Sequence, residues 1–223
     1  MQKFATPALV PTVLDIPAGR IQFIAADRGD TTVDIRPFDA AKNRDVQAAE
    51  RIAVAYVDGV LRIEAAPATS PLLGSSGYVE VTVQLPAGSP IDVTTASAEL
   101  RGVGRLGDVT FAGAGGSVKL DEAASADLTL QNGGITVGRL GGSARLSTQK
   151  GDLVVTEAVA GTVTLTTEYG AISVGVARGT AATLDAGTAF GRIHNALQAP
   201  GATTEALTIN ASTGHGDITA ATV

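Results

Sequence analysis

Four acidic residues in the middle of the chain are the side chains best suited to bond-breaking chemistry: Asp121, Glu122, Asp127 and Asp152. Glycoside hydrolysis needs two carboxylates at a set separation, one of them with a raised pKa, and some stacked β enzymes cleave polysaccharides with clustered aspartates. These acids are scattered, however, and most stand beside glycine or at positions that face outward. The pattern indicates solvated surface acids, and a polysaccharide-active enzyme remains an alternative function.

The two histidines, His194 and His215, fall at different places in the sequence pattern. Two isolated histidines do not make a metal site, and an acid or base role needs a partner within hydrogen-bond reach. Cysteine is absent, which removes thiolate metal sites and disulfides. We therefore predict no catalytic residue and no metal ligand.

The segment Gly102–Gly107 (GVGRLG) fits the G-x-G-x-x-G pattern of dinucleotide sites. Such a site needs a helix directly afterwards, because the helix N-terminus holds the pyrophosphate. A strand-like segment, Asp108–Phe111, follows instead. The sequence of Val103–Gly107 also recurs 34 residues later, as Val137–Gly141. A recurring element indicates a structural turn, so no cofactor is predicted.

One recurring position is more suggestive of binding. Lys150, Tyr169, Phe190 and His215 each immediately precede a glycine in successive repeats. If the repeats stack in register, these four side chains align along one edge of the molecule. They would then form a binding stripe for a protein or glycan, or their rings would stack on each other and cover the edge of the core.

The elements that position these residues are short strands recurring about every nine residues from Val109 onward. A repeat of this kind indicates a stacked β architecture. We predict six repeats of two strands each, with an insertion loop at Gln198–Glu205 before the last: 109–111 with 118–120, 126–128 with 135–137, 144–146 with 153–155, 163–165 with 172–174, 182–184 with 193–195, and 207–209 with 218–219.

Alternation of apolar and polar residues places one side chain inside and the next outside. Strands this short are stabilised mainly by neighbouring repeats. We therefore predict an all-β fold: a single-stranded, β-helix-like solenoid over 98–223, with an irregular β cap over 1–97, in one continuous unit. The alternative is an antiparallel β-sandwich. End repeats expose strand edges, and the end at Ile218–Val223 has no evident cover. Self-association through this C-terminal edge is therefore a candidate interaction.

The N-terminal region lacks the nine-residue rhythm but carries other β signals. Asp58-Gly59 lies between two apolar runs and predicts a hairpin. The polar stretch Lys42–Glu50 is either one short helix or a loop.

Composition limits the function classes. The 223 residues carry a net charge of −6 with 4% aromatic residues and no tryptophan. Without a basic face, nucleic acid is not an expected partner. No apolar run is long enough to span a membrane, and the start lacks the apolar core of a signal peptide. The chain as written is expected in the cytoplasm, or at the cell surface if it is a trimmed form of an exported protein.

Three segments resemble a known family: Gly151–Val155 (GDLVV), Tyr169–Val174 (YGAISV) and Gly216–Ile218 (GDI). They are similar to the "G-D-I-x-V" repeats of the bacterial β-strand-repeat proteins labelled putative adhesins, a domain of unknown function, over roughly 98–223. The opening LDIPAGRIQFIAADR is similar to the actinobacterial branch. The resemblance implies a β-solenoid-like sheet stack without an established reaction.

These observations favour a non-enzymatic, adhesin-like interaction or scaffold module without cofactors, which binds an unidentified protein or glycan. A self-assembling, polymer-forming solenoid is the alternative of a different class.

Overall fold

The computed structural model describes residues 1–66, 77–198 and 206–223, so the predicted insertion loop lies, apart from Gln198, outside the described residues. Most of the described chain is strand. The elements are β1 (Gln2–Ala5), β2 (Thr12–Ala26), β3 (Asp30–Pro37), α1 (Asn43–Glu50), β4 (Ile52–Val57), β5 (Val60–Ala65), β6 (Val79–Pro86), β7 (Ile91–Asn132), β8 (Ile135–Leu140), β9 (Ala144–Lys150), β10 (Leu153–Ala158), β11 (Gly161–Tyr169), β12 (Ile172–Val176), β13 (Ala181–Phe190), β14 (Ile193–Ala196), β15 (Ala206–His215) and β16 (Ile218–Thr222).

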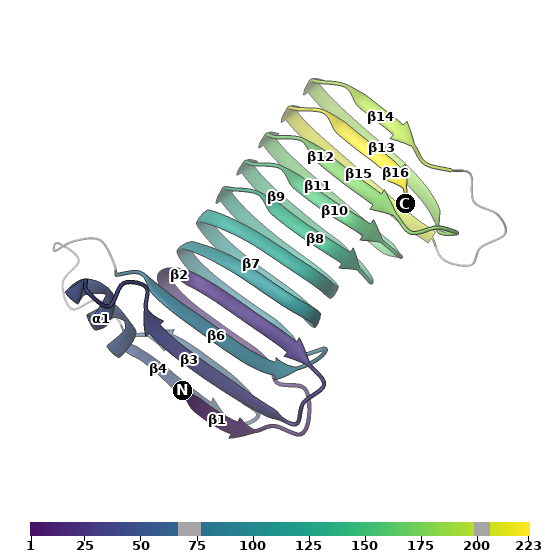
Figure 1. Cartoon of the computed structure of the whole chain (residues 1–223). Coiled ribbons are helices and arrows are strands. Elements are labelled where there is room, and N and C mark those ends of the chain that lie inside the picture. The colour runs from purple at the N-terminus through teal and green to yellow at the C-terminus, as the bar shows by residue number, and fades with distance from the viewer. Residues whose placement is uncertain (67–76, 199–205) are drawn as a thin grey trace.

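The strands form a stack of arches with two faces (Figure 1). Strands β9, β11, β15 and β13 lie on one face, and β8, β10, β12, β16 and β14 lie on the other. Within each face neighbouring strands pair in parallel, for example β11 with β9 and β10 with β12. We call two consecutive strands, one on each face, a rung. The predicted solenoid-like stack is confirmed, and the antiparallel sandwich is wrong because these pairs are parallel.

The core lies between the two faces and is filled by every second side chain. Leu128, Leu146 and Leu165 are fully buried in consecutive rungs. Asp127 and Arg145, which directly precede the first two of these leucines, are exposed. Buried residues from Val10 to Ile218 form a single hydrophobic cluster. Because the cluster is continuous along the stack, each rung is stabilised by the rungs on either side of it.

Antiparallel strands close the N-terminal end of the stack. Strands β1 and β3 pair antiparallel, as do β4 and β5, and α1 lies beside them (Figure 1). The β4–β5 turn has positive φ at Asp58 (51°) and Gly59 (79°), which confirms the predicted hairpin. Parallel pairing already begins at β2, and β7 runs without interruption through the predicted boundary at residue 97.

Asp30 holds this end together through two cations. Its carboxylate oxygens lie 2.8 Å from Arg28 Nε and 2.9 Å from Lys3 Nζ. Hydrogen bonds from Arg28 and Lys3 lower the pKa of Asp30 to about 2, from an ordinary value of 3.8. A lowered folded-state pKa contributes stability above the unfolded pKa, and this stability is lost as the pH falls through the folded value.

We therefore expect Asp30→Asn to be less stable than the wild type at pH 7, with the difference shrinking between pH 4 and pH 2. Urea unfolding at several pH values measures this difference. The exposed turn variant Asp58→Asn, measured over the same range, serves as the control. If the stability difference between Asp30→Asn and the wild type stays constant over this pH range, the lowered pKa of Asp30 is contradicted.

The last two rungs stack out of sequence order. The rung formed by β15 and β16 lies between the rung of β11 and β12 and the rung of β13 and β14. The end rung of the described stack is therefore β13 and β14, and not the C-terminal segment. The prediction that Ile218–Val223 forms the open edge is wrong, because β16 pairs with both β12 and β14.

Side-chain polarity accounts for this order. Asn195 is in register with Ala220, which is in register with the buried Val174, so an internal β14 would bury an amide in the core. Burial of an unpaired amide is unfavourable. The rung with buried Leu207, Ile209 and Ile218 lies inside instead, and Asn195 lies at the end. The pairing places Leu184 opposite Ile209, as the predicted repeats have it, but aligns both with Val163 rather than with Leu165, a shift of two residues along β11.

Candidate functional site

The stacking brings the four residues of the predicted stripe together at one turn of the solenoid. The strand register pairs Lys150 with Tyr169, Tyr169 with His215, and His215 with Phe190. We call this row the turn ladder. Because the last two rungs are exchanged, the order along the stack is Lys150, Tyr169, His215, Phe190. Asn132 precedes Lys150 in the same row.

A four-residue motif positions each member of the turn ladder. The motif reads Thr-x-x-Gly, with the ladder residue third, at 148–151, 167–170, 188–191 and 213–216. In β11, Thr167 Oγ1 donates a hydrogen bond to the carbonyl of Gly151 (3.1 Å), and Gly151 N donates to the carbonyl of Tyr169 (2.9 Å). The same pair of hydrogen bonds recurs at the other rungs, with distances of 2.8–3.1 Å between the donor atom and the carbonyl oxygen. The threonine was the missed signal, visible in the sequence as a constant residue two positions before each ladder residue.

The three rings of the turn ladder stack on one another. The His215 ring lies 4.8 Å from Tyr169 and 4.7 Å from Phe190 between ring centroids, with interplanar angles of 12° and 16°. Tyr169 is 55% exposed and Phe190 is 67% exposed. The ring faces of His215 are therefore occupied, and the row presents ring edges to solvent. Among the described residues, two ring faces of the row have no ring against them: the face of Tyr169 toward Lys150, and the outer face of Phe190 on the end strand β13.

Acidic side chains fasten the neighbouring rungs directly beside the turn ladder. Asp217 accepts a hydrogen bond from Arg192 N (2.8 Å) and pairs with the Arg192 guanidinium (3.1 Å). The backbone and side-chain hydrogen bonds from Arg192 lower the pKa of Asp217. Asp152 accepts the equivalent bond from Ala171 N (2.8 Å). These aspartates hold the backbone at the turn in place, and so they hold the ladder residues in register.

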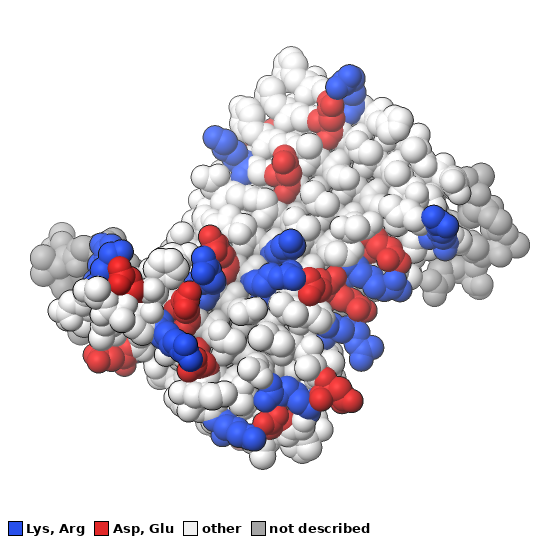
Figure 2. Space-filling model, viewed as in Figure 1, with Lys and Arg blue, Asp and Glu red and all other residues white. Residues whose placement is uncertain are grey.

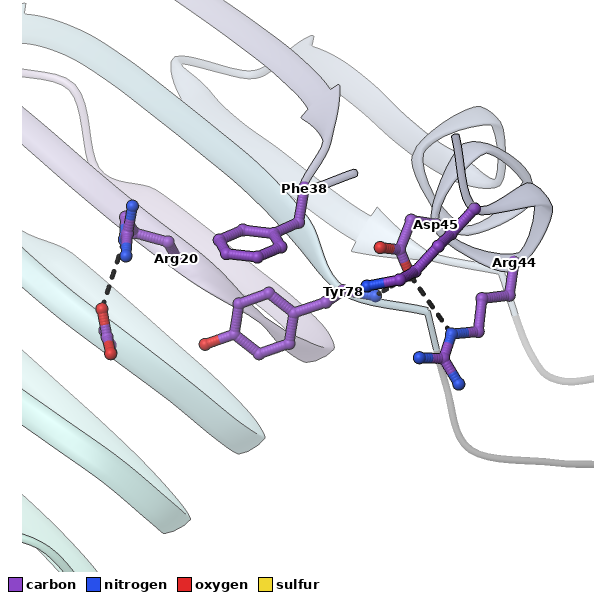
Figure 3. Close-up of a pocket in the computed structure, with 7 residues that line it drawn as sticks. Arg20, Phe38, Arg44, Asp45 and Tyr78 are labelled. Atoms are coloured by element: carbon purple, nitrogen blue, oxygen red, sulfur yellow. Dashed lines mark hydrogen bonds and ion pairs between the residues drawn. The ribbon is translucent and has the colours of Figure 1, made fainter. Parts of the chain in front are cut away.

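A second candidate lies in a hollow at the N-terminal end of the molecule (Figure 3). Phe38 packs edge-on against Tyr78 with ring centroids 5.0 Å apart, and the Arg20 guanidinium lies 5.5 Å from the Phe38 ring centre. Burial and the nearby Glu99 carboxylate raise the pKa of Tyr78. Buried Asp45 accepts a hydrogen bond from Tyr78 N (3.0 Å) and so connects α1 to the backbone that carries the Tyr78 ring.

The charges of this hollow are paired with one another. Arg20 lies 3.4 Å from Glu80 and 3.2 Å from Glu99, and Lys42 lies 3.2 Å from Asp39. The hollow therefore offers aromatic surface without a strong positive or negative electrostatic potential. Figure 2 shows the same mixture over the whole visible face, where basic and acidic side chains lie next to one another.

The acids considered for catalysis do not converge. Asp121 pairs with Arg101 (2.6 Å), and Glu122 lies beside Arg139 (4.0 Å). Asp127 points outward from β7 in register with Arg145, and Asp152 lies at the turn. Within residues 1–66, 77–198 and 206–223, no three His, Asp or Glu side chains gather where a metal ion could bind. The arrangement provides cross-rung pairing rather than a pair of facing carboxylates.

The remaining motifs are structural. Gly102–Gly107 lies within β7, and Gly104 (φ 80°) forms a corner where its N–H faces Asp121 Oδ2 at 3.3 Å. His194 is exposed on β14, which follows β13 on the opposite face, and so lies past the turn that carries Phe190. His215 is the only histidine that the fold brings to the turn ladder.

Parallel arches with a constant turn motif and a shared core define a protein of the β-strand-repeat class. The chain matches the family described as Toastrack DUF4097 over residues 11–223 and belongs to that family. No curated protein matches its sequence. In the described part of the chain, no helix has the length and apolar character needed to cross a bilayer.

Three solved structures are similar to this chain. A putative adhesin from Bacteroides fragilis is 12% identical, with a TM-score of 0.49 over 98% of this chain and 95% of that one. A putative cell adhesion protein from Clostridium sporogenes is 13% identical, with a TM-score of 0.41 over 98% and 94%. A putative lipid binding protein from Parabacteroides distasonis is 10% identical, with a TM-score of 0.38 over 100% and 95%.

Proposed function

We propose that this protein is a non-enzymatic interaction module that binds an extended protein or glycan partner along the turn ladder. The observation that carries the proposal is the alignment of Lys150, Tyr169, His215 and Phe190 in consecutive rungs, with two large rings left more than half exposed. The core beneath the rings is already closed by buried Thr148, Thr167 and Thr213, which supports a role in binding for the exposed rings.

The chemistry of the stripe suits a chain-like ligand. Lys150 supplies an ammonium group, Tyr169 a hydroxyl group and His215 ring nitrogens, each one strand spacing apart, or about 4.8 Å. Donors repeated at that interval can contact successive units of a ligand that runs parallel to the stack. Tyrosine also provides a large contact area at low cost in conformational entropy, which is why it is enriched at binding hot spots.

Binding measurements with a matched control test this proposal. The immobilised wild type is screened against a panel of polysaccharides and extended peptides, and each ligand found is measured again with Tyr169→Ala. We expect about a tenfold loss of affinity, the effect of a typical hot-spot truncation, with the melting temperature changed by only a few degrees.

Phe38→Ala is the matched control, because it removes a 45% exposed ring at the opposite end of the molecule. This variant is expected to bind as the wild type does. Loss of binding in Phe38→Ala alone would move the site to the hollow of Figure 3 and overturn the proposal. A Tyr169→Ala variant that melts much earlier but binds normally would show that the rings only stabilise the turn.

A further inference from the structure

We propose that two copies of this chain pair head to head through the end rung formed by β13 and β14. The interaction surface is the end of the stack itself, and its occupant is the same surface of a second copy. This pairing requires no ligand of the turn ladder, although the ladder residue Phe190 belongs to both surfaces.

The end rung leaves both strand edges and part of the core uncovered. Among the described residues, β13 pairs only with β15, and β14 pairs only with β16. Ile193 is 46% exposed, whereas Ile218, its partner in the neighbouring rung, is 1% exposed. The other end of the stack carries antiparallel strands and a helix over its last parallel strands. In the described part of the chain, the fold therefore covers one end of the stack and leaves the other open.

Protective features of edge strands are missing from β13. Natural edges are blunted by lysine, proline or a bulge. The sequence of β13 is AATLDAGTAF, with no lysine, arginine or proline, and its register with β15 runs without a shift from Ala181 to Thr188. Such an edge can accept another strand along its whole length.

Two-fold symmetry allows two arrangements of the copies, both with antiparallel pairing across the interface. In the first, β13 meets β13 of the second copy. In the second, β13 meets β14 of the second copy. The only charged side chain of β13 is Asp185, while β14 carries His194 and follows Arg192. Because like charges on facing strands are destabilising, charge complementarity favours the second arrangement.

The turn ladder selects the same arrangement. The open face of Phe190 points along the stack, since its other face stacks on His215. In the second arrangement the two-fold axis runs along the strands, so the ladders of both copies lie at the same end of their strands. Phe190 of each copy then meets Phe190 of the other, and the ring stack continues across the interface. In the first arrangement the ladders lie at opposite ends.

Asn195 also fits a symmetric partner. It lies at an inward position of β14, so the carboxamides of two copies approach the axis from opposite faces. Each carboxamide has donors and an acceptor that can satisfy the other.

Light scattering on the whole chain, coupled to size exclusion over a hundredfold concentration range, tests the proposal. We expect a mass that rises to twice 22.3 kDa and no further. Ile193→Lys places a charge at the open end of the core and is expected to remain monomeric. Val57→Lys, which changes a 57% exposed residue at the opposite end, is expected to dimerise as the wild type does.

Charge reversal tests the orientation without touching the core. Asp185→Lys is expected to weaken the dimer about tenfold, because symmetry counts each cross-strand pair twice, and His194→Glu in the same chain is expected to restore it. A constant monomer mass overturns the proposal, as does a mass that grows beyond the dimer. Dimerisation that is unaffected by Asp185→Lys overturns the arrangement of β13 against β14.

Discussion

Gly151→Ala is expected to be among the most destabilising single substitutions in this protein, with a loss of more than about 4 kcal/mol in the free energy of unfolding, a magnitude reserved for severe steric or core defects. Gly151 has φ of +153°, and a Cβ there would lie 2.1 Å from the carbonyl oxygen of Gly133 in the next rung. Neither rung can move aside, because that same oxygen accepts a hydrogen bond from buried Thr148.

Chemical denaturation of Gly151→Ala beside Gly187→Ala measures the effect. A Cβ at Gly187 would meet nothing within 4 Å, and its φ is not positive, so this control is expected to be neutral or slightly stabilising. Equal stability of the two variants would contradict the close approach of the rungs at the turn.

Ile209→Asp and Leu184→Asp are expected to differ widely, although the two residues are register partners on neighbouring strands. Ile209 is fully buried between β11 and β13, so a carboxylate there loses its water without gaining a partner. Leu184 lies on the end strand and is half-buried, and a carboxylate there can turn to solvent. We expect a loss of about 4 kcal/mol or more for Ile209→Asp and about 1–2 kcal/mol for Leu184→Asp.

Hydrogen exchange resolves this difference segment by segment, which suits a repeat protein whose end rungs can open separately. Ile209→Asp is expected to remove protection from both β15 and β13, and Leu184→Asp from β13 alone. A stack in sequence order would place Leu184 inside and Ile209 at the end, so the opposite ranking would refute the exchanged rungs.

Much of the stack could be predicted from the sequence because its physical causes are local. Period-two alternation identified the inward leucines, such as Leu146, and a glycine after each ladder residue marked the turns. The alignment of Tyr169 with its neighbours followed from these two facts together with the assumption that the repeats stack in register. The binding role of the turn ladder stays a proposal.

The order of the last rungs could not be read from the repeats, because every rung offers the same parallel edge to the next. The deciding residue was Asn195, an inward amide in a row of aliphatic side chains, and it becomes meaningful only when the rows are aligned. The hollow at the other end was missed for a different reason. Phe38 and Tyr78 lie far apart in the sequence and share no repeat, so only the folded cap brings them together.

The exchanged rungs also constrain the order in which the chain can fold during synthesis. A ribosome makes β13 and β14 before β15 and β16, yet the later pair lies underneath the earlier one. The earlier pair therefore reaches its final neighbours only after β15 and β16 have been synthesised. For a chain that otherwise can assemble one arch at a time as it emerges, residues 206–223 have to take a place beneath a rung that precedes them in the sequence.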